Sequence, residues 1–140
     1  MLVAYVSGPY RDRTEYGVKC NVDRAEKVAL ELWNMGFAVI CPHKNTFLFG
    51  GAGPNQDDDI WLEGDLEFVR RSDIVVTIPG WVESEGSRAE VQEARKNEIP
   101  VLHWPSSKLS IYQYIERAQQ SIKDRDRLHE PGVLRGIHFG

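Results

Sequence analysis

The sequence has few cysteines and no long apolar run, and both shortages narrow the range of possible proteins. Two of its 140 residues are cysteines, Cys20 and Cys41, and they are not spaced as a CxxC pair. Such cysteines fit a reduced, cytoplasmic protein better than a disulfide scaffold. No apolar stretch approaches the roughly 20 residues that span a bilayer, and Met1 leads directly into a strand pattern rather than a signal peptide. We therefore expect a cytoplasmic protein with no membrane partner.

An excess of positive charge is also missing. The formal net charge is −4, from 17 Lys and Arg residues against 21 Asp and Glu residues. No global field attracts a nucleic-acid backbone, so nucleic acid is not an expected partner. The chain is 41% hydrophobic and 27% charged, which is ordinary for a soluble protein, and its length suits one domain. A small anionic ligand would need a local basic group.

Apolar runs and helical patterns alternate along the chain. Short apolar runs bounded by Gly or Pro predict four strands, near residues 2–6, 37–41, 73–78 and 100–104. Apolar residues spaced three or four apart predict four helices, near residues 21–35, 59–71, 85–97 and 110–123. Asp58 or Asp59 can cap the second helix. Residues 43–55 are rich in Gly and Asn and predict a long loop, which in a compact domain is often a functional lid.

This alternation is typical of an α/β fold, a parallel sheet with helices on both faces. We predict one flavodoxin-like or Rossmann-like domain at residues 1–124, with four or five strands and a ligand crevice between the first and third strands. A charged tail follows at residues 125–140. The tail either frays or forms an arm that packs on a partner subunit of a homo-oligomer, since Leu134, Ile137 and Phe139 are apolar.

Two carboxylates are predicted to face the crevice. Glu90 falls in the second turn of the helix after the third strand, and ligands in open α/β sheets bind where such helices begin. Asp65 shares an apolar helix face with Leu62 and Val69, where a carboxylate is costly unless it is paired or functional. Two converging carboxylates indicate glycosidic-bond chemistry. The alternatives are structural, with Asp65 bonded to a backbone amide and Glu90 solvated.

The first turn and the start of the third helix offer groups for an anion. Gly8 allows close approach of a ligand to the backbone, and Arg11 can grip a phosphate through two bonds. Ser84 and Ser87 lie at the start of the helix, where free amides bind either capping hydroxyls or a phosphate. A solvated Arg and simple caps are the alternatives.

Three further residues could line the crevice. Trp81 follows the third strand, and His43 and Asn45 follow the second, where they could equally be hydrogen-bonding partners within the loop. The His, Asp and Glu residues of the chain match no compact metal motif. We therefore expect neither a metal nor a cofactor.

Three segments resemble the nucleoside 2-deoxyribosyltransferase superfamily. They are YVSGPYR at residues 5–11, GDLEFVRRSDIVV at residues 64–76 and SEGSRAE at residues 84–90. The first is similar to the family's phosphate loop, and the second to its Asp-Leu-Glu helix. The third, with Gly86 in its motif, is similar to the segment that ends in the nucleophilic Glu. Within the superfamily, the chain resembles the 2′-deoxynucleoside 5′-phosphate N-hydrolases and the phage-type deoxyribosyltransferase-like proteins.

The resemblance implies an enzyme whose partner is a small nucleotide or nucleoside. It would hydrolyse the N-glycosidic bond of a (deoxy)nucleoside 5′-monophosphate and give a free base and (deoxy)ribose 5-phosphate. Glu90 would attack C1′ of the sugar and Asp65 would assist proton transfer at the base. Tyr5 would hold Glu90 or the sugar.

The phosphate would be held by Arg11, Ser84 and Ser87 if the resemblance extends to the ligand. Nucleoside transferases carry an Asp at the position of Ser84, so this departure favours a nucleotide and the hydrolase branch. The alternatives are a deoxyribosyltransferase that exchanges bases and a non-catalytic nucleotide-binding module.

Overall fold

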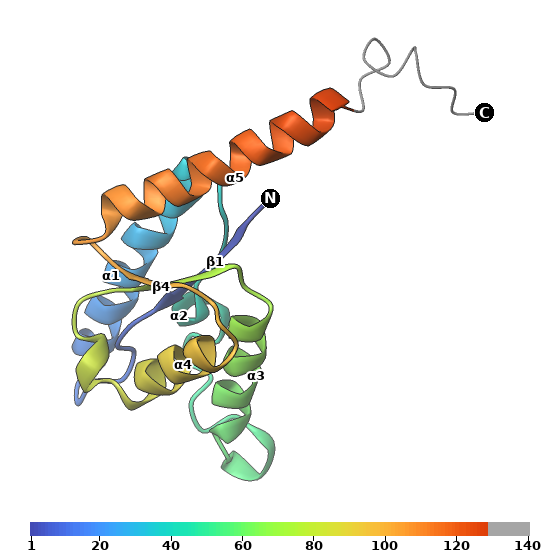
Figure 1. The fold of residues 1–140 in the computed structure, drawn as a ribbon. Coiled ribbons are helices and arrows are strands. Elements are labelled where there is room, and N and C mark those ends of the chain that lie inside the picture. Colours follow the sequence, from blue (N-terminus) through green and yellow to red (C-terminus); the bar gives the residue numbers. More distant parts are fainter. Residues whose placement is uncertain (129–140) are drawn as a thin grey trace.

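Four short parallel strands form the centre of the molecule. The computed structural model, which describes residues 1–128, places them in the order β2-β1-β3-β4 (Figure 1). Their bounds are β1 (Val3–Ser7), β2 (Ala38–Ile40), β3 (Ile74–Thr77) and β4 (Val101–His103). The central strands β1 and β3 are buried almost throughout, because helices cover both faces of a parallel sheet and leave little room for polar side chains.

Five helices connect or follow the strands. They are α1 (Glu15–Met35), α2 (Pro42–Asn45), α3 (Asp59–Arg70), α4 (Glu85–Lys96) and α5 (Lys108–Leu128), with 3-10 turns η1 (Pro54–Gln56) and η2 (Trp81–Glu83). The side chain of Thr14 caps α1 by accepting from the Gly17 amide at 2.9 Å. Gly36 ends that helix with a φ of 110°, a left-handed conformation that glycine adopts without strain.

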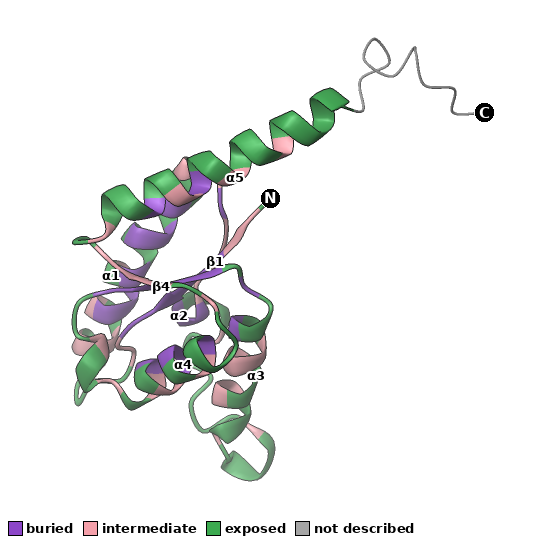
Figure 2. Ribbon diagram, viewed as in Figure 1, coloured by how far each residue is buried: buried purple, intermediate pink, exposed green. Residues whose placement is uncertain are grey.

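Alternate residues of β1 belong to two different cores. Ala4 and Val6 pack with buried residues of α1 and α5 on one face of the sheet. Tyr5 lies on the other face, with Val69 of α3 and Ala94 of α4. Figure 2 shows this burial along the sheet and along the sheet-facing sides of the helices. The polar side chains that matter for the site project from this second face.

The order of elements agrees with the sequence prediction of an α/β fold with four or five parallel strands, of which the described residues form four, but three segments differ. The first helix begins at Glu15 rather than near residue 21, because Thr14 supplies a cap. The predicted loop at residues 43–55 contains the end of α2 and the start of η1. The last helix continues to Leu128 instead of ending near residue 123, and Asp124 pairs with Arg127 one turn later at 3.4 Å.

The C-terminal half of α5 projects beyond the sheet (Figure 1). The apolar residues of the predicted arm, Leu134, Ile137 and Phe139, lie outside the described residues. Within residues 1–128, no helix combines the length and the apolar character that crossing a bilayer would require.

Candidate active site

Glu90 is a carboxylate in the second turn of α4, buried against the sheet. Its side chain is 5% exposed, and its neighbours on the inward face of the helix are Val91 and Ala94. The helix begins at the cap Ser84, whose hydroxyl accepts from the Ser87 amide at 3.2 Å. The helical period of α4 turns Glu90 toward β1, so the strand and the helix together define the site.

Two side chains of β1 donate hydrogen bonds to this carboxylate. The Tyr5 hydroxyl donates to Oε2 of Glu90, and the Ser7 hydroxyl donates to Oε1 at 2.9 Å. Tyr5 and Ser7 are two residues apart on a strand and therefore face the same side of the sheet. Sequence reasoning named Tyr5 but missed Ser7, although this spacing was the available signal. Both oxygens of Glu90 are thus held from one strand.

Burial shifts the protonation of the whole cluster. It raises the pKa of Glu90 to about 8; the hydrogen bonds from Tyr5 and Ser7 oppose this shift, and the charge of Asp65 adds to it. Burial also raises the pKa of Tyr5 well above its ordinary value, and the nearby charges of Glu90 and Asp65 act in the same direction. Tyr5 therefore remains a hydrogen-bond donor at neutral pH.

Asp65 is the second carboxylate of the cluster and comes from the middle of α3. It is half-buried, and burial raises its pKa from 3.8 to about 6. Its charge raises the pKa values of both Glu90 and Tyr5, so the three groups lie within electrostatic reach of one another. The structure therefore brings together the three residues that the resemblance assigned to catalysis.

The predicted phosphate-binding residues lie in two segments, the turn after β1 and the start of α4. Arg11 is exposed after β1, and its backbone carbonyl accepts from the Asn21 side chain at 3.4 Å. The Ser87 hydroxyl is buried and has no hydrogen-bond partner among residues 1–128. Gly86 borders open space, whereas a Cβ at Gly8 would collide with Ile78. Gly8 thus serves close packing between the β1 and β3 ends.

The first turn is fastened by His43, one of the residues predicted for the crevice. His43 is 4% exposed, and its Nε2 lies 3.1 Å from the Gly8 carbonyl and 3.0 Å from the Pro9 carbonyl. Carbonyls only accept, so Nε2 carries a proton and donates. Burial lowers the pKa of His43, which keeps the ring neutral. The Nε2 edge of the His43 ring is therefore engaged by the protein backbone.

The loop before α3 is also tied to the first turn. The Leu48 amide donates to the Tyr10 hydroxyl at 3.0 Å. Asp58 precedes α3 as predicted, but its carboxylate accepts from the Gly51 amide and the Trp61 indole instead of capping the helix. The loop is therefore anchored at both of its ends.

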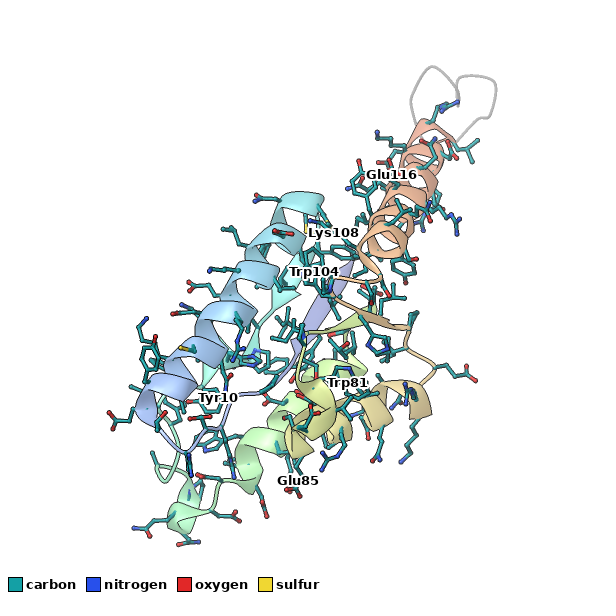
Figure 3. The ribbon with its side chains drawn as sticks, turned by 90° about the vertical axis from the view of Figure 1, so that its left-hand side faces the viewer. Tyr10, Trp81, Glu85, Trp104, Lys108 and Glu116 are labelled. Atoms are coloured by element: carbon teal, nitrogen blue, oxygen red, sulfur yellow. The ribbon has the colours of Figure 1, made fainter. Side chains whose placement is uncertain are left out.

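Asn45 and Trp81 occupy different surroundings. Asn45 lines a groove of about 560 Å³ that runs along β2 between α1 and α3 and includes Trp33 and Phe68, but none of Tyr5, Asp65 or Glu90. Trp81 lies in η2 and stacks on His103, with ring centroids 5.4 Å apart and planes at 9°. Figure 3 shows Tyr10, Trp81 and Glu85 at the same end of the molecule, on separate loops and helix starts.

No three His, Cys, Asp or Glu side chains within residues 1–128 are arranged to hold a metal ion. Cys20 and Cys41 are both free in that part of the chain.

Comparisons with known proteins bear mainly on the fold. The family model described as "Domain of unknown function (DUF1937)" matches residues 3–106. A solved structure of a 2-deoxyribosyltransferase from the psychrotolerant bacterium Bacillus psychrosaccharolyticus has a TM-score of 0.56 and 18% identity, and the match covers 72% of this chain and 70% of that chain. No curated protein matches significantly. The predicted flavodoxin-like fold is confirmed.

Glu90→Gln should make the stability of the protein less dependent on pH. The folded wild type keeps a proton on Glu90 up to about pH 8, whereas an exposed Glu releases it near 4.5. Because the raised pKa favours the protonated folded state, the free energy of unfolding falls as the pH rises from about 4.5 to 8, by on the order of a few kcal/mol. Gln has no such proton. Urea unfolding of both proteins at pH 5 and pH 8 measures the difference.

The exposed Glu85→Gln variant on the same helix is the control and should follow the wild type. Equal pH dependence in Glu90→Gln and wild type would show that Glu90 does not hold its proton.

Proposed function

The chain belongs to the DUF1937 family, and we propose that this member cleaves the N-glycosidic bond of a nucleoside 5′-monophosphate by hydrolysis. One observation carries the proposal: the buried carboxylate of Glu90 lies against the carboxyl-terminal half of β1, held by Tyr5 and Ser7, within electrostatic reach of Asp65. The fold shared with a 2-deoxyribosyltransferase and the three resembling segments support the same chemistry.

Glu90 fits the role of a nucleophile. A carboxylate attacks an anomeric carbon when it is ionised, aimed and shielded from water. The bonds from Tyr5 and Ser7 favour the ionised form and fix the direction of the carboxylate. Each oxygen has further lone pairs, so one hydrogen bond per oxygen still leaves an electron pair for the sugar.

Asp65 fits the role of the proton carrier. With pKa values of about 6 and 8, Asp65 and Glu90 together hold one proton between roughly pH 6 and pH 8. The reactive arrangement is the one in which Asp65 carries that proton and Glu90 is ionised. Both arrangements contain the same number of protons, so the pH range of activity is that of the pair rather than of either residue.

The proposed reaction has two balanced steps. In the first, a carboxylate oxygen of Glu90 bonds to C1′, the bond from C1′ to the base nitrogen breaks, and the Asp65 proton passes to the leaving base. In the second, water bonds to C1′ and the ester bond to Glu90 breaks, while Asp65 takes the proton of the water. The products are a free base and a sugar 5-phosphate.

The phosphate is assigned to the start of α4 and the first turn. Free backbone amides and the positive end of the helix dipole favour an anion there. The buried Ser87 hydroxyl, which has no partner in the described part of the chain, lies in the first turn of α4, and an exposed Arg11 follows β1. A nucleotide therefore suits the site better than a free nucleoside. Product analysis decides whether water or a second base accepts the sugar in the second step.

Glu90→Gln should abolish release of base from nucleoside monophosphates while the variant stays folded. Gln keeps the shape and can still accept a bond from Tyr5, but it cannot form the ester intermediate, so turnover should fall by orders of magnitude. Chromatography of a panel of ribo- and deoxyribonucleoside monophosphates, with and without an added free base, gives the substrate and the acceptor.

Glu93→Gln is the matched control, because Glu93 lies on the same helix and pairs with Arg70 at 2.9 Å outside the cluster. Turnover retained in Glu90→Gln would reject the nucleophile. A wild type that binds nucleotides without turnover would be a binding module, and base exchange in place of hydrolysis would make it a transferase.

Asp65→Asn should lower the rate and change the shape of its pH profile. The wild-type kcat/KM should be highest between about pH 6 and pH 8, since the pair is doubly protonated below this range and doubly ionised above it. Asn removes the acid, so the rate should fall by roughly 10²- to 10⁴-fold and the alkaline limb should disappear. A bell-shaped profile that survives in the variant would assign the proton transfer to another group.

Arg11→Ala should reduce the preference for nucleotides over nucleosides. Charge-assisted hydrogen bonds to a phosphate are worth about 1.5–3 kcal/mol, so the ratio of kcat/KM for a monophosphate over its nucleoside should fall at least roughly tenfold. Arg13→Ala, an exposed Arg on the same loop, is the control and should leave the ratio in place. An unchanged ratio in Arg11→Ala would mean that Arg11 is only solvated.

A further inference from the structure

A row of polar side chains runs across the carboxyl ends of three strands. Ser7 of β1 pairs in register with Thr77 of β3, and Thr77 pairs with His103 of β4. Register partners in neighbouring strands project from the same face, so all three share the face on which Glu90 lies. The preceding row on the same face, two residues earlier in each strand, is largely apolar and consists of Tyr5, Val75 and Val101. Sequence analysis identified neither Thr77 nor His103.

His103 is held in this row from two directions. Its Nδ1 forms a hydrogen bond with the hydroxyl of Thr77, a residue that is fully buried. Its ring lies flat against the indole of Trp81, with centroids 5.4 Å apart and an angle of 9° between the planes. These two contacts leave the His103 ring little freedom to rotate, so the ring offers a rigid face on which Trp81 packs.

Trp81 connects this surface to α4. It opens η2, its amide donates to the Ile78 carbonyl at 3.2 Å, and its carbonyl accepts from the amide of the cap Ser84 at 3.1 Å. Arg88 of α4 donates back to the Val82 carbonyl of the same turn at 2.7 Å. The ring stack therefore fastens the end of β4 to the segment that sets where α4 begins.

We propose that His103 is a positioning residue that fixes the phosphate-binding start of α4 through its stack on Trp81. This inference rests on the proposed function for the identity of the ligand. It assigns His103 an effect on phosphate affinity, because the amides of α4 and the buried Ser87 hydroxyl move with the turn that Trp81 anchors. Bond cleavage at Glu90, which is held separately by β1, is affected far less.

Two substitutions at His103 separate the stack from the hydrogen bond. His103→Asn keeps a polar atom for Thr77 but loses the aromatic face, whereas His103→Phe keeps the face and loses the bond. Loss of one aromatic pair is expected to change an equilibrium constant by about two- to tenfold. The dissociation constant for inorganic phosphate, measured by calorimetry, should rise by that factor in His103→Asn and change less than twofold in His103→Phe.

Trp81→Leu completes the test as a double-mutant cycle. It should weaken phosphate binding as much as His103→Asn does, and the double variant should be no weaker than Trp81→Leu alone, since both changes remove one stack. Unchanged binding in His103→Asn, additive losses in the double variant, or no phosphate binding by the wild type would each overturn the inference. A residue with only a structural role would lower the melting temperature of both His103 variants without separating their phosphate affinities.

Base release from nucleoside monophosphates, assayed on the same proteins, reports the proposed function separately. Where that function holds, His103→Asn should raise KM for the monophosphate and leave kcat within about twofold to threefold. Phosphate affinities that follow the predicted order without any base release would support the positioning role and reject the reaction.

Discussion

The burial of one carboxylate is the constraint around which the rest of the site is arranged. Glu90 is 5% exposed on a helix face that otherwise packs against the sheet, and an unpaired carboxylate there would be strongly disfavoured. The two donors on β1 compensate part of this cost, and the raised pKa shows that they do not compensate all of it. The remaining cost is typical of groups that a fold retains for chemistry rather than for stability.

Different structural elements position the different residues around Glu90. Strand β1 holds the carboxylate, α3 brings Asp65, and the stack of Trp81 on His103 sets the start of α4. His43 and Tyr10 fasten the first turn and the loop that follows α2. Under the proposed function, separate anchors of this kind would let the phosphate, the sugar and the base of a nucleotide be held by different parts of the chain. The groove along β2 contains none of the catalytic candidates and lies on a different surface.

The sequence was sufficient for the order of the elements and for the inward placement of the two carboxylates, because both follow from local periodicity. Apolar runs identified the strands, and the helical repeat turned Glu90 and Asp65 inward. It was insufficient where contacts join distant segments: nothing near His103 indicates that it meets Thr77 and Trp81, 26 and 22 residues away in the printed sequence. The sequence predicts a tail where the charged end of α5 lies, because ion pairs such as that of Asp124 with Arg127 form only once the chain is helical. Ser7 was within reach of the strand alternation but was overlooked.

The alternation of β1 between the two faces of the sheet ties the evolution of the site to that of the fold. Ala4 and Val6 fill one core, while Tyr5 and Ser7 serve the other face and the carboxylate. Inserting or deleting a single residue in this strand would exchange the two sets, placing polar groups among aliphatic ones and removing both donors from Glu90. We therefore expect this strand to accept only substitutions of matching size and polarity, and new specificity to arise in the loops that follow the strands.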